Sequence, residues 1–94
     1  MPSLIEIVEK ELNIPKKRLV EEGVKRFLEI ELKNLSIEIR KLSGRYGVNS
    51  FNELWEKLKA GEITEAVCFD DLSRLEHLEL EKEKVIKLLQ KAVQ

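Results

Sequence analysis

The chain has 94 residues, a length that suits one small domain with one hydrophobic core. Its formal net charge is −1, which excludes a general electrostatic affinity for nucleic acid or for an anionic membrane. Charged residues reach 37% and aromatic residues only 5%, so aliphatic packing must form the core. Most of the charge comes from Glu and Lys, a composition typical of thermophilic proteins and of highly helical ones.

The single cysteine, Cys68, excludes an intrachain disulfide and favours a reducing compartment. The first residues lack the basic-then-apolar order of a secretory signal. Apolar runs stay well below the roughly 18 residues that a membrane-spanning helix needs. We therefore expect a cytoplasmic protein without a membrane partner.

The first predicted helix begins after Ser3, which forms a capping box with Glu6, and ends near Asn13. Its apolar face consists of Leu4, Ile5, Val8 and Leu12. Pro15 suits the first position of the next helix, because its fixed backbone angle is already helical.

A long helix is predicted over residues 15–43, and it organises the rest of the chain. Apolar residues recur there at steps of three or four: Val20, Val24, Leu28, Leu32, Leu35, Ile39 and Leu42. Twenty-nine helical residues span about 43 Å, whereas a compact globule of this chain length measures only about 30 Å. This helix should therefore protrude, or another long helix should lie beside it.

The same helix has apolar residues on a second side. Ile30 and Ile37 are seven residues apart and lie roughly opposite the main stripe, with Phe27 between the two faces. Either the N-terminal helix or a second subunit should cover this side. We take Phe27, Ile30 and Ile37 as candidate self-association residues of a homodimer, and Gly23 as a point where another helix could cross closely.

A third helix is predicted from Ser50, which forms a capping box with Glu53, to Ala60. Its apolar face consists of Phe51, Leu54, Trp55 and Leu58. We expect Trp55 to anchor the core, although tryptophan is also enriched among residues that dominate protein interfaces.

The last helix is predicted over residues 70–92, with Asp70 and Arg74 as an i, i+4 ion pair. The preceding stretch, residues 62–69, alternates in polarity and predicts either an extended linker or a short strand that pairs with a partner's edge. Since the second and fourth helices are both long, they should form an antiparallel, coiled-coil-like hairpin. The predicted fold is all-α, with four helices in one domain spanning residues 1–94.

Residues 13–28 resemble the turn and second helix of ribbon-helix-helix proteins, with Gly23 at the small position and Phe27-Leu28 as the closing aromatic-Leu pair. That resemblance implies dimerisation and the antitoxin role of many family members. The DNA-reading β-ribbon has no counterpart, since only Met1 and Pro2 precede Ser3, so no DNA-contacting residue is carried over. As a whole, the chain resembles small uncharacterised archaeal helical proteins suspected of being antitoxins.

Residues with catalytic or metal-binding chemistry are sparse. His77 and Glu81 could supply two metal ligands from one helix face, but Zn²⁺ normally needs at least three from the protein. Cys68 has no flanking base to lower its pKa. We therefore expect no catalytic residue, no metal site and no cofactor, and a protein that is not an enzyme.

Acidic residues concentrate in residues 62–83, with eight acids against two basic residues. Such a segment is either a solvated helix face or a site for a basic protein, for example a ribonuclease toxin. The candidate partner-binding residues are Val67, Phe69, Asp70 and Asp71.

The alternative function is a small nucleic-acid-associated dimer that uses a basic helix end. Its candidate residues are Lys16, Lys17, Arg18, Lys25 and Arg26. Glu21 and Glu22 lie among them, which favours a solvated helix face and makes nucleic acid an unlikely partner.

Overall fold

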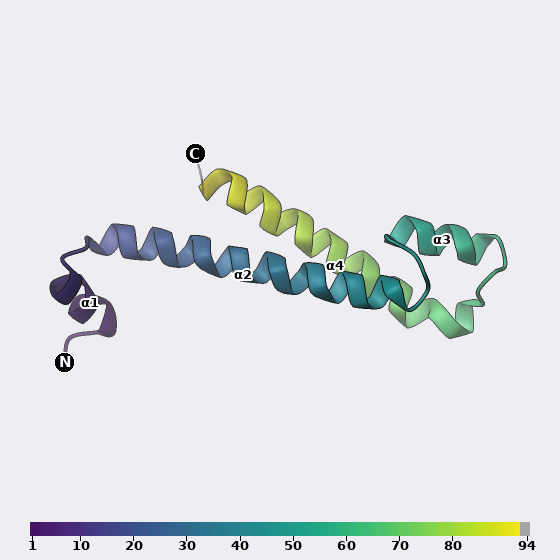
Figure 1. Ribbon diagram of the computed structural model, residues 1–94, viewed down its shortest axis with the longest axis horizontal. Coiled ribbons are helices and arrows are strands. Elements are labelled where there is room, and N and C mark those ends of the chain that lie inside the picture. The colour runs from purple at the N-terminus through teal and green to yellow at the C-terminus, as the bar shows by residue number, and fades with distance from the viewer. Residues whose placement is uncertain (93–94) are drawn as a thin grey trace.

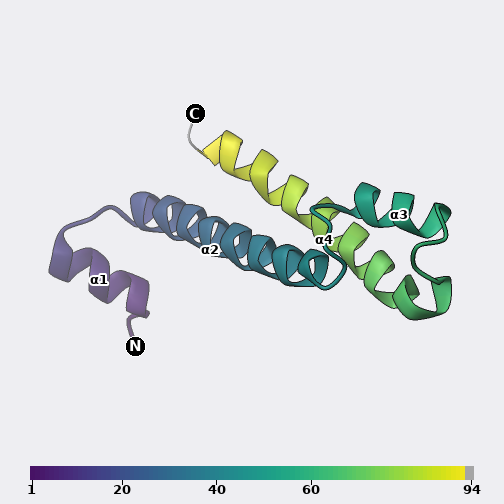
Figure 2. The same ribbon diagram turned by 45° about the vertical axis from the view of Figure 1, so that its right-hand side comes forward.

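The computed structural model describes residues 1–92, and these residues form four helices and no strand (Figure 1). The helices are α1 (Leu4–Leu12), α2 (Lys16–Gly44), α3 (Phe51–Lys59) and α4 (Glu65–Ala92). In both views α2 and α4 lie side by side and run in opposite directions (Figures 1 and 2). The molecule measures 62 × 29 × 16 Å, so α2 protrudes as its length predicts. The predicted all-α fold is confirmed.

The hydrophobic core lies at the closed end of the hairpin, where α3 packs against α4. Its buried residues come from α2, the following loop, α3 and α4: Leu42, Val48, Leu54, Leu72, Leu75 and Leu78. Leu35 and Ile39 extend this contact along α2. Toward the other end the two long helices diverge, and the start of α2 extends past the end of α4 (Figure 1). Val20 and Val24, predicted to belong to the same buried stripe, are therefore exposed.

The N-terminal helix is capped as predicted but contributes nothing to the core. The Ser3 hydroxyl accepts a hydrogen bond from the Glu6 amide, and Asn13 ends α1 in the left-handed conformation with φ 53°. The Glu9 carboxylate accepts a bond from the Lys16 amide at 3.0 Å, which fixes the turn into α2. None of the nine residues of α1 is buried.

Two predictions at the closed end are wrong. Trp55 is 41% exposed, because α3 turns Leu54, rather than the indole, fully into the core. Residues 62–69 do not form a strand, and the linker between α3 and α4 is confined to residues 62–64, since α4 begins at Glu65. The Thr64 carbonyl accepts bonds from the amides of Val67 and Cys68 and so starts the helix. The alternation of polar and apolar residues over 62–69 therefore does not correspond to a strand.

Candidate protein-interaction surfaces

A polar clamp joins the end of α2 to α4. Tyr46 donates a hydrogen bond to the Asp71 carboxylate, and Arg45 Nη1 lies 3.7 Å from Asp71 Oδ2. The bond to Asp71, together with partial burial and the negative charge of the carboxylate, raises the pKa of Tyr46 to about 12. Asp71, a predicted partner-binding residue, thus holds the hairpin end together.

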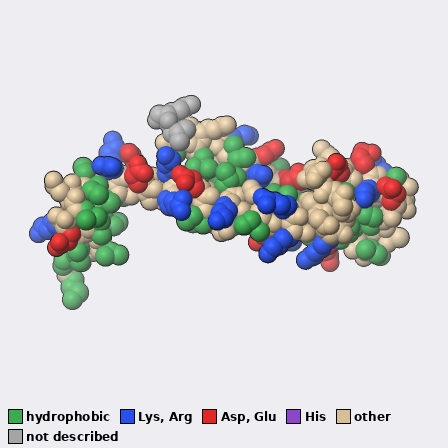
Figure 3. Space-filling view, viewed as in Figure 1, with side chains coloured by type: hydrophobic (Ala, Val, Ile, Leu, Met, Phe, Trp, Pro, Cys, Tyr) green, Lys and Arg blue, Asp and Glu red, His purple; other side chains and the backbone are tan. Residues whose placement is uncertain are grey.

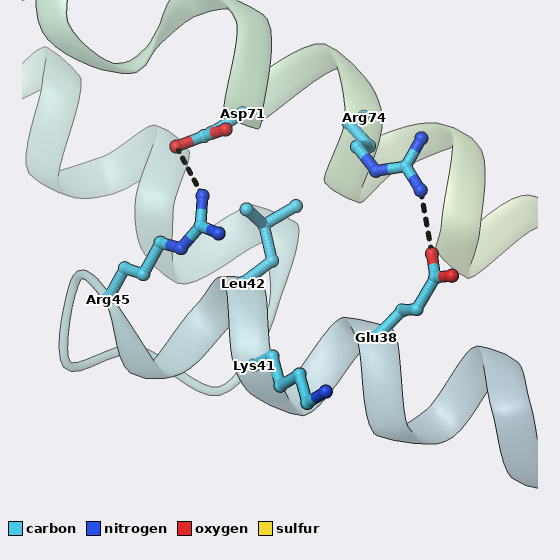
Figure 4. A pocket seen from close by; sticks show the side chains of 6 residues that line it. All are labelled: Glu38, Lys41, Leu42, Arg45, Asp71 and Arg74. Atoms are coloured by element: carbon cyan, nitrogen blue, oxygen red, sulfur yellow. Dashed lines mark hydrogen bonds and ion pairs between the residues drawn. The ribbon is translucent and has the colours of Figure 1, made fainter.

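The clamp borders an open groove of about 210 Å³ that is lined mainly by charged side chains (Figure 4). Its lining residues are Glu38, Lys41, Leu42, Arg45, Asp71 and Arg74. Arg74 Nη2 lies 2.7 Å from Glu38 Oε2, so both carboxylates in the groove already face arginines. These two ion pairs link α2 with α4.

The residues with potential for chemistry lie apart from that groove. Cys68 is fully buried in the inner face of α4, and His77 is exposed on the same helix. Among residues 1–92, no group of three or more His, Cys, Asp or Glu side chains gathers closely enough to hold a metal ion. The helices over this range also include none that combines the length and apolar character required to cross a membrane.

A second groove, of about 330 Å³, lies between α3 and α4 and has an aromatic wall. It is lined by Phe51, Trp55, Leu72, Ser73 and Glu76. The exposed indole of Trp55 lies beside this groove, with the Lys59 ammonium 6.0 Å from the ring centroid. Tryptophan is one of the residues that most often dominate the binding energy at protein interfaces.

The groove continues into a stripe on α4 that we call the outer face. Its members follow one another at three or four residues, which places them on one side of the helix: Glu65, Phe69, Ser73, Glu76, Leu80 and Glu83. Phe69 is 54% exposed and Leu80 is 53% exposed. The outer face therefore combines two apolar side chains with three exposed carboxylates, next to Trp55.

The structure separates the predicted partner-binding residues. Val67 is exposed, but it is two residues from Phe69 and so points about 200° away around α4. Val67 lines a different groove, together with Tyr46 and Lys57. Asp70 is exposed, whereas Asp71 is half-buried in the clamp. Of the four predicted partner-binding residues, Phe69 is thus the one that lies on the outer face.

Sequence reasoning missed Leu80 and assigned Trp55 to the core. The spacing Phe69, Ser73, Glu76, Leu80 could have indicated the outer face, since it follows the helical repeat. Nothing in the sequence indicated which side of α4 the short helix α3 would cover.

A third surface is the second apolar side of α2. Phe27 is 61% exposed, Ile30 is also exposed, and Ile37 on the same side is half-buried. A Cβ added at Gly23 would meet nothing within 4 Å. Since Ile30 stays exposed, α1 does not cover this side, which removes the intramolecular alternative. Figure 3 shows that hydrophobic side chains also gather over α1, at the end of the molecule where α2 begins.

The basic residues at the start of α2 do not form one face. Lys17 and Arg26 are nine residues apart and so lie on opposite sides of the helix. Lys17 lies 4.0 Å from Glu21, and Arg26 lies 3.3 Å from Glu29. This arrangement matches a solvated helix and does not favour the nucleic-acid alternative.

These features define a small all-α protein built on an extended helical hairpin with exposed apolar faces. The chain belongs to the Uncharacterized protein MJ0235 family, which it matches over residues 1–92. It is 42% identical to Uncharacterized protein MJ0235 of the archaeon Methanocaldococcus jannaschii over 73 residues, or 78% of this chain and 88% of the relative. No solved structure matches this chain. These matches do not confirm the ribbon-helix-helix and antitoxin-like resemblances, and the thermophilic source stays a prediction.

Proposed function

We propose that this protein is a non-catalytic protein-interaction module: a cytoplasmic homodimer that binds a basic protein through the α3–α4 groove and the outer face of α4. The observation that carries the proposal is the pair of exposed aromatic residues, Trp55 and Phe69, on one acidic surface. A soluble monomer rarely exposes large adjacent apolar side chains unless a partner covers them.

The charges of this surface indicate the chemistry of the partner. Glu65, Glu76 and Glu83 are exposed around Phe69 and Leu80, and exposed Asp70 adds a further carboxylate beside them. Acidic side chains around apolar anchors speed association with a basic surface and disfavour acidic competitors. A basic protein that carries an apolar projection would fit this arrangement.

An antitoxin is the specific form of module that we propose. Its support is the concentration of acids in residues 62–83, together with the partial resemblance of residues 13–28 to ribbon-helix-helix proteins. The homodimer is supported by the exposed residues Phe27 and Ile30, which lie on the side of α2 away from α4. The lone cysteine supports a reducing compartment.

Affinity capture from a lysate of the source organism tests the partner proposal. The wild-type chain should retain a stoichiometric basic protein that is released by high salt, because screening weakens the contact between opposite charges. Leu80→Asp should abolish capture by placing a charge among the apolar anchors. Val67→Asp is the matched control, since Val67 is also an exposed apolar residue of α4 but lies on the opposite side of the helix.

Two results would count against this function. One is the absence of any stoichiometric protein at low salt. The other is a captured protein that Leu80→Asp and Val67→Asp retain equally, which would place binding away from the outer face.

A further inference from the structure

The exposed side of α2 follows a heptad repeat, the pattern by which helices pair as coiled coils. With Phe27 at position a, the a positions are Val20, Phe27 and Asn34, and the d positions are Gly23, Ile30 and Ile37. We propose that this face pairs with α2 of a second copy as a parallel, in-register, two-stranded coiled coil. The inference rests on the homodimer proposed above and specifies its surface and its orientation.

The face is available because α4 occupies the other side of α2. Leu35, Ile39 and Leu42 pack toward α4, whereas Phe27 and Ile30 are exposed. The repeat from Val20 to Ile37 covers about 27 Å of helix. So short a coiled coil is marginal for isolated peptides, because each helix must first form. Here α2 is a 29-residue helix whose C-terminal half packs against α4, so the helix is already anchored at one end of the repeat and that cost is smaller.

The charges beside the face select a second copy in parallel orientation. In a parallel pair, each g position meets the e position five residues further along the other chain. Arg26 at g would then meet Glu31 of the partner subunit. The next e position, Glu38, is already paired with Arg74 of its own chain, so the Arg26–Glu31 contact carries the charge argument. An antiparallel pair would instead bring g against g, so that Arg26, Lys33 and Arg40 would repel one another.

Two further residues agree with this pairing. Asn34 is exposed at a central a position, where a single asparagine fixes the register and the two-stranded state of parallel coiled coils. Gly23 is disfavoured within a helix, and nothing in its own chain lies where its Cβ would be. The close approach of a second backbone would account for glycine there. The face ends after Ile37, because the next a position is Lys41.

Parallel pairing also accounts for α1 and affects the partner sites. It places both copies of α1 at one end of the dimer, where their exposed apolar residues Leu4, Ile7 and Leu12 can cover each other. It places both α3–α4 grooves at the other end (Figure 1). The dimer would thus present two acidic outer faces to one basic partner, or to two.

Disulfide cross-linking of the full chain tests the orientation. In a Cys68→Ala background, Asn34→Cys should form an interchain disulfide under mild oxidation, since identical a positions face each other across a parallel pair. Glu29→Cys is the matched control, because position c points away from the axis and should remain unlinked. If the measured molecular mass is that of two chains but Asn34→Cys forms no interchain disulfide, the parallel arrangement is overturned and the homodimer is not. A single-chain mass at all concentrations would overturn both.

A charge swap in the chain with its native cysteine provides a second test that does not depend on Cys68→Ala. Arg26→Glu should weaken dimerisation about tenfold in sedimentation equilibrium, because two symmetric pairs become repulsive. Adding Glu31→Arg should restore the wild-type constant. Ile30→Asp should give single chains, whereas Val67→Asp should dimerise normally. Equal dimerisation constants for the single and double charge variants would overturn the proposed pairing. Capture of the basic protein is a separate experiment, so a failure to capture it does not change how these dimerisation constants are interpreted.

Discussion

Arg74 and Glu38 link the two long helices across the hairpin, with Arg74 Nη2 2.7 Å from Glu38 Oε2. The sequence predicted that Arg74 would pair with Asp70 one turn earlier on its own helix. The antiparallel packing instead brings a carboxylate of α2 within reach. Both side chains stay largely in water, 59% and 50% exposed, so the pair orients the helices more than it stabilises them.

Breaking this pair should therefore cost little. We expect Arg74→Ala to lower the free energy of unfolding by less than about 1 kcal/mol in urea denaturation, because solvent screens exposed ion pairs. A double-mutant cycle with Glu38→Ala should give a coupling energy of roughly 0.5 kcal/mol. A coupling well above 2 kcal/mol would show that the pair is a main support of the hairpin.

Stability should depend instead on the closed end of the hairpin. Leu75 is fully buried, and Leu75→Ala should cost about 2–5 kcal/mol because it leaves a cavity in the core. Leu88→Ala is the matched control, since Leu88 is exposed on the same helix and should change the free energy of unfolding by only about 0.5 kcal/mol. Similar losses at both positions would contradict the assignment of the core.

The clamp between Tyr46 and Asp71 should make stability depend on pH in the alkaline range. The neutral Tyr46 hydroxyl donates the hydrogen bond, and the fold raises its pKa from 10.0 to about 12. Its contribution is therefore fully present below pH 10 and is lost as the pH rises to 12. Tyr46→Phe should cost about 1–2 kcal/mol at neutral pH.

The comparison of wild type with Tyr46→Phe isolates this effect from the lysines, which also titrate at high pH. The difference in unfolding free energy between the two proteins should shrink between pH 10 and pH 12. A difference that stays constant over this range would mean that the hydroxyl is not bonded to Asp71 in solution.

Asn34 should control the number of chains in the assembly. We expect Asn34→Ile to raise the thermal stability of the assembly, because it replaces a polar side chain on the pairing axis. The same change should broaden the mass distribution in light scattering toward trimers, since isoleucine at both a and d favours three strands. A variant that behaves as the wild type in both measurements would place Asn34 outside an interface.

The sequence predicted the helices best where local chemistry decides the structure. Ser3 and Ser50 cap their helices as expected, and each hydroxyl accepts a bond from the amide three residues on. The start of α4 was misplaced because residues 62–69 alternate in polarity, although the last five of them form about one and a half turns of helix with Cys68 as the buried residue.

The surfaces were harder to predict because they depend on tertiary packing. The spacing that placed Trp55 with Leu54 does not say which of the two faces α4, and the structure buries Leu54 while the indole stays at the surface. Proximity in sequence suggested one patch around Val67 and Phe69, but the helix turns these two residues to opposite sides. The second apolar side of α2 was predictable, because a seven-residue spacing needs only a continuous helix.

In the proposed dimer, α2 presents its second face to an identical helix in the same orientation. Pulsed electron spin resonance on Cys68→Ala/Arg40→Cys chains, spin-labelled at position 40, measures this orientation. Helices that pack about 8–10 Å apart, parallel and in register, should give an interchain label distance below roughly 25 Å. An antiparallel pair centred on the same face would separate the labels by roughly 35 Å or more, and that distance, or the absence of any interchain coupling, would contradict the account.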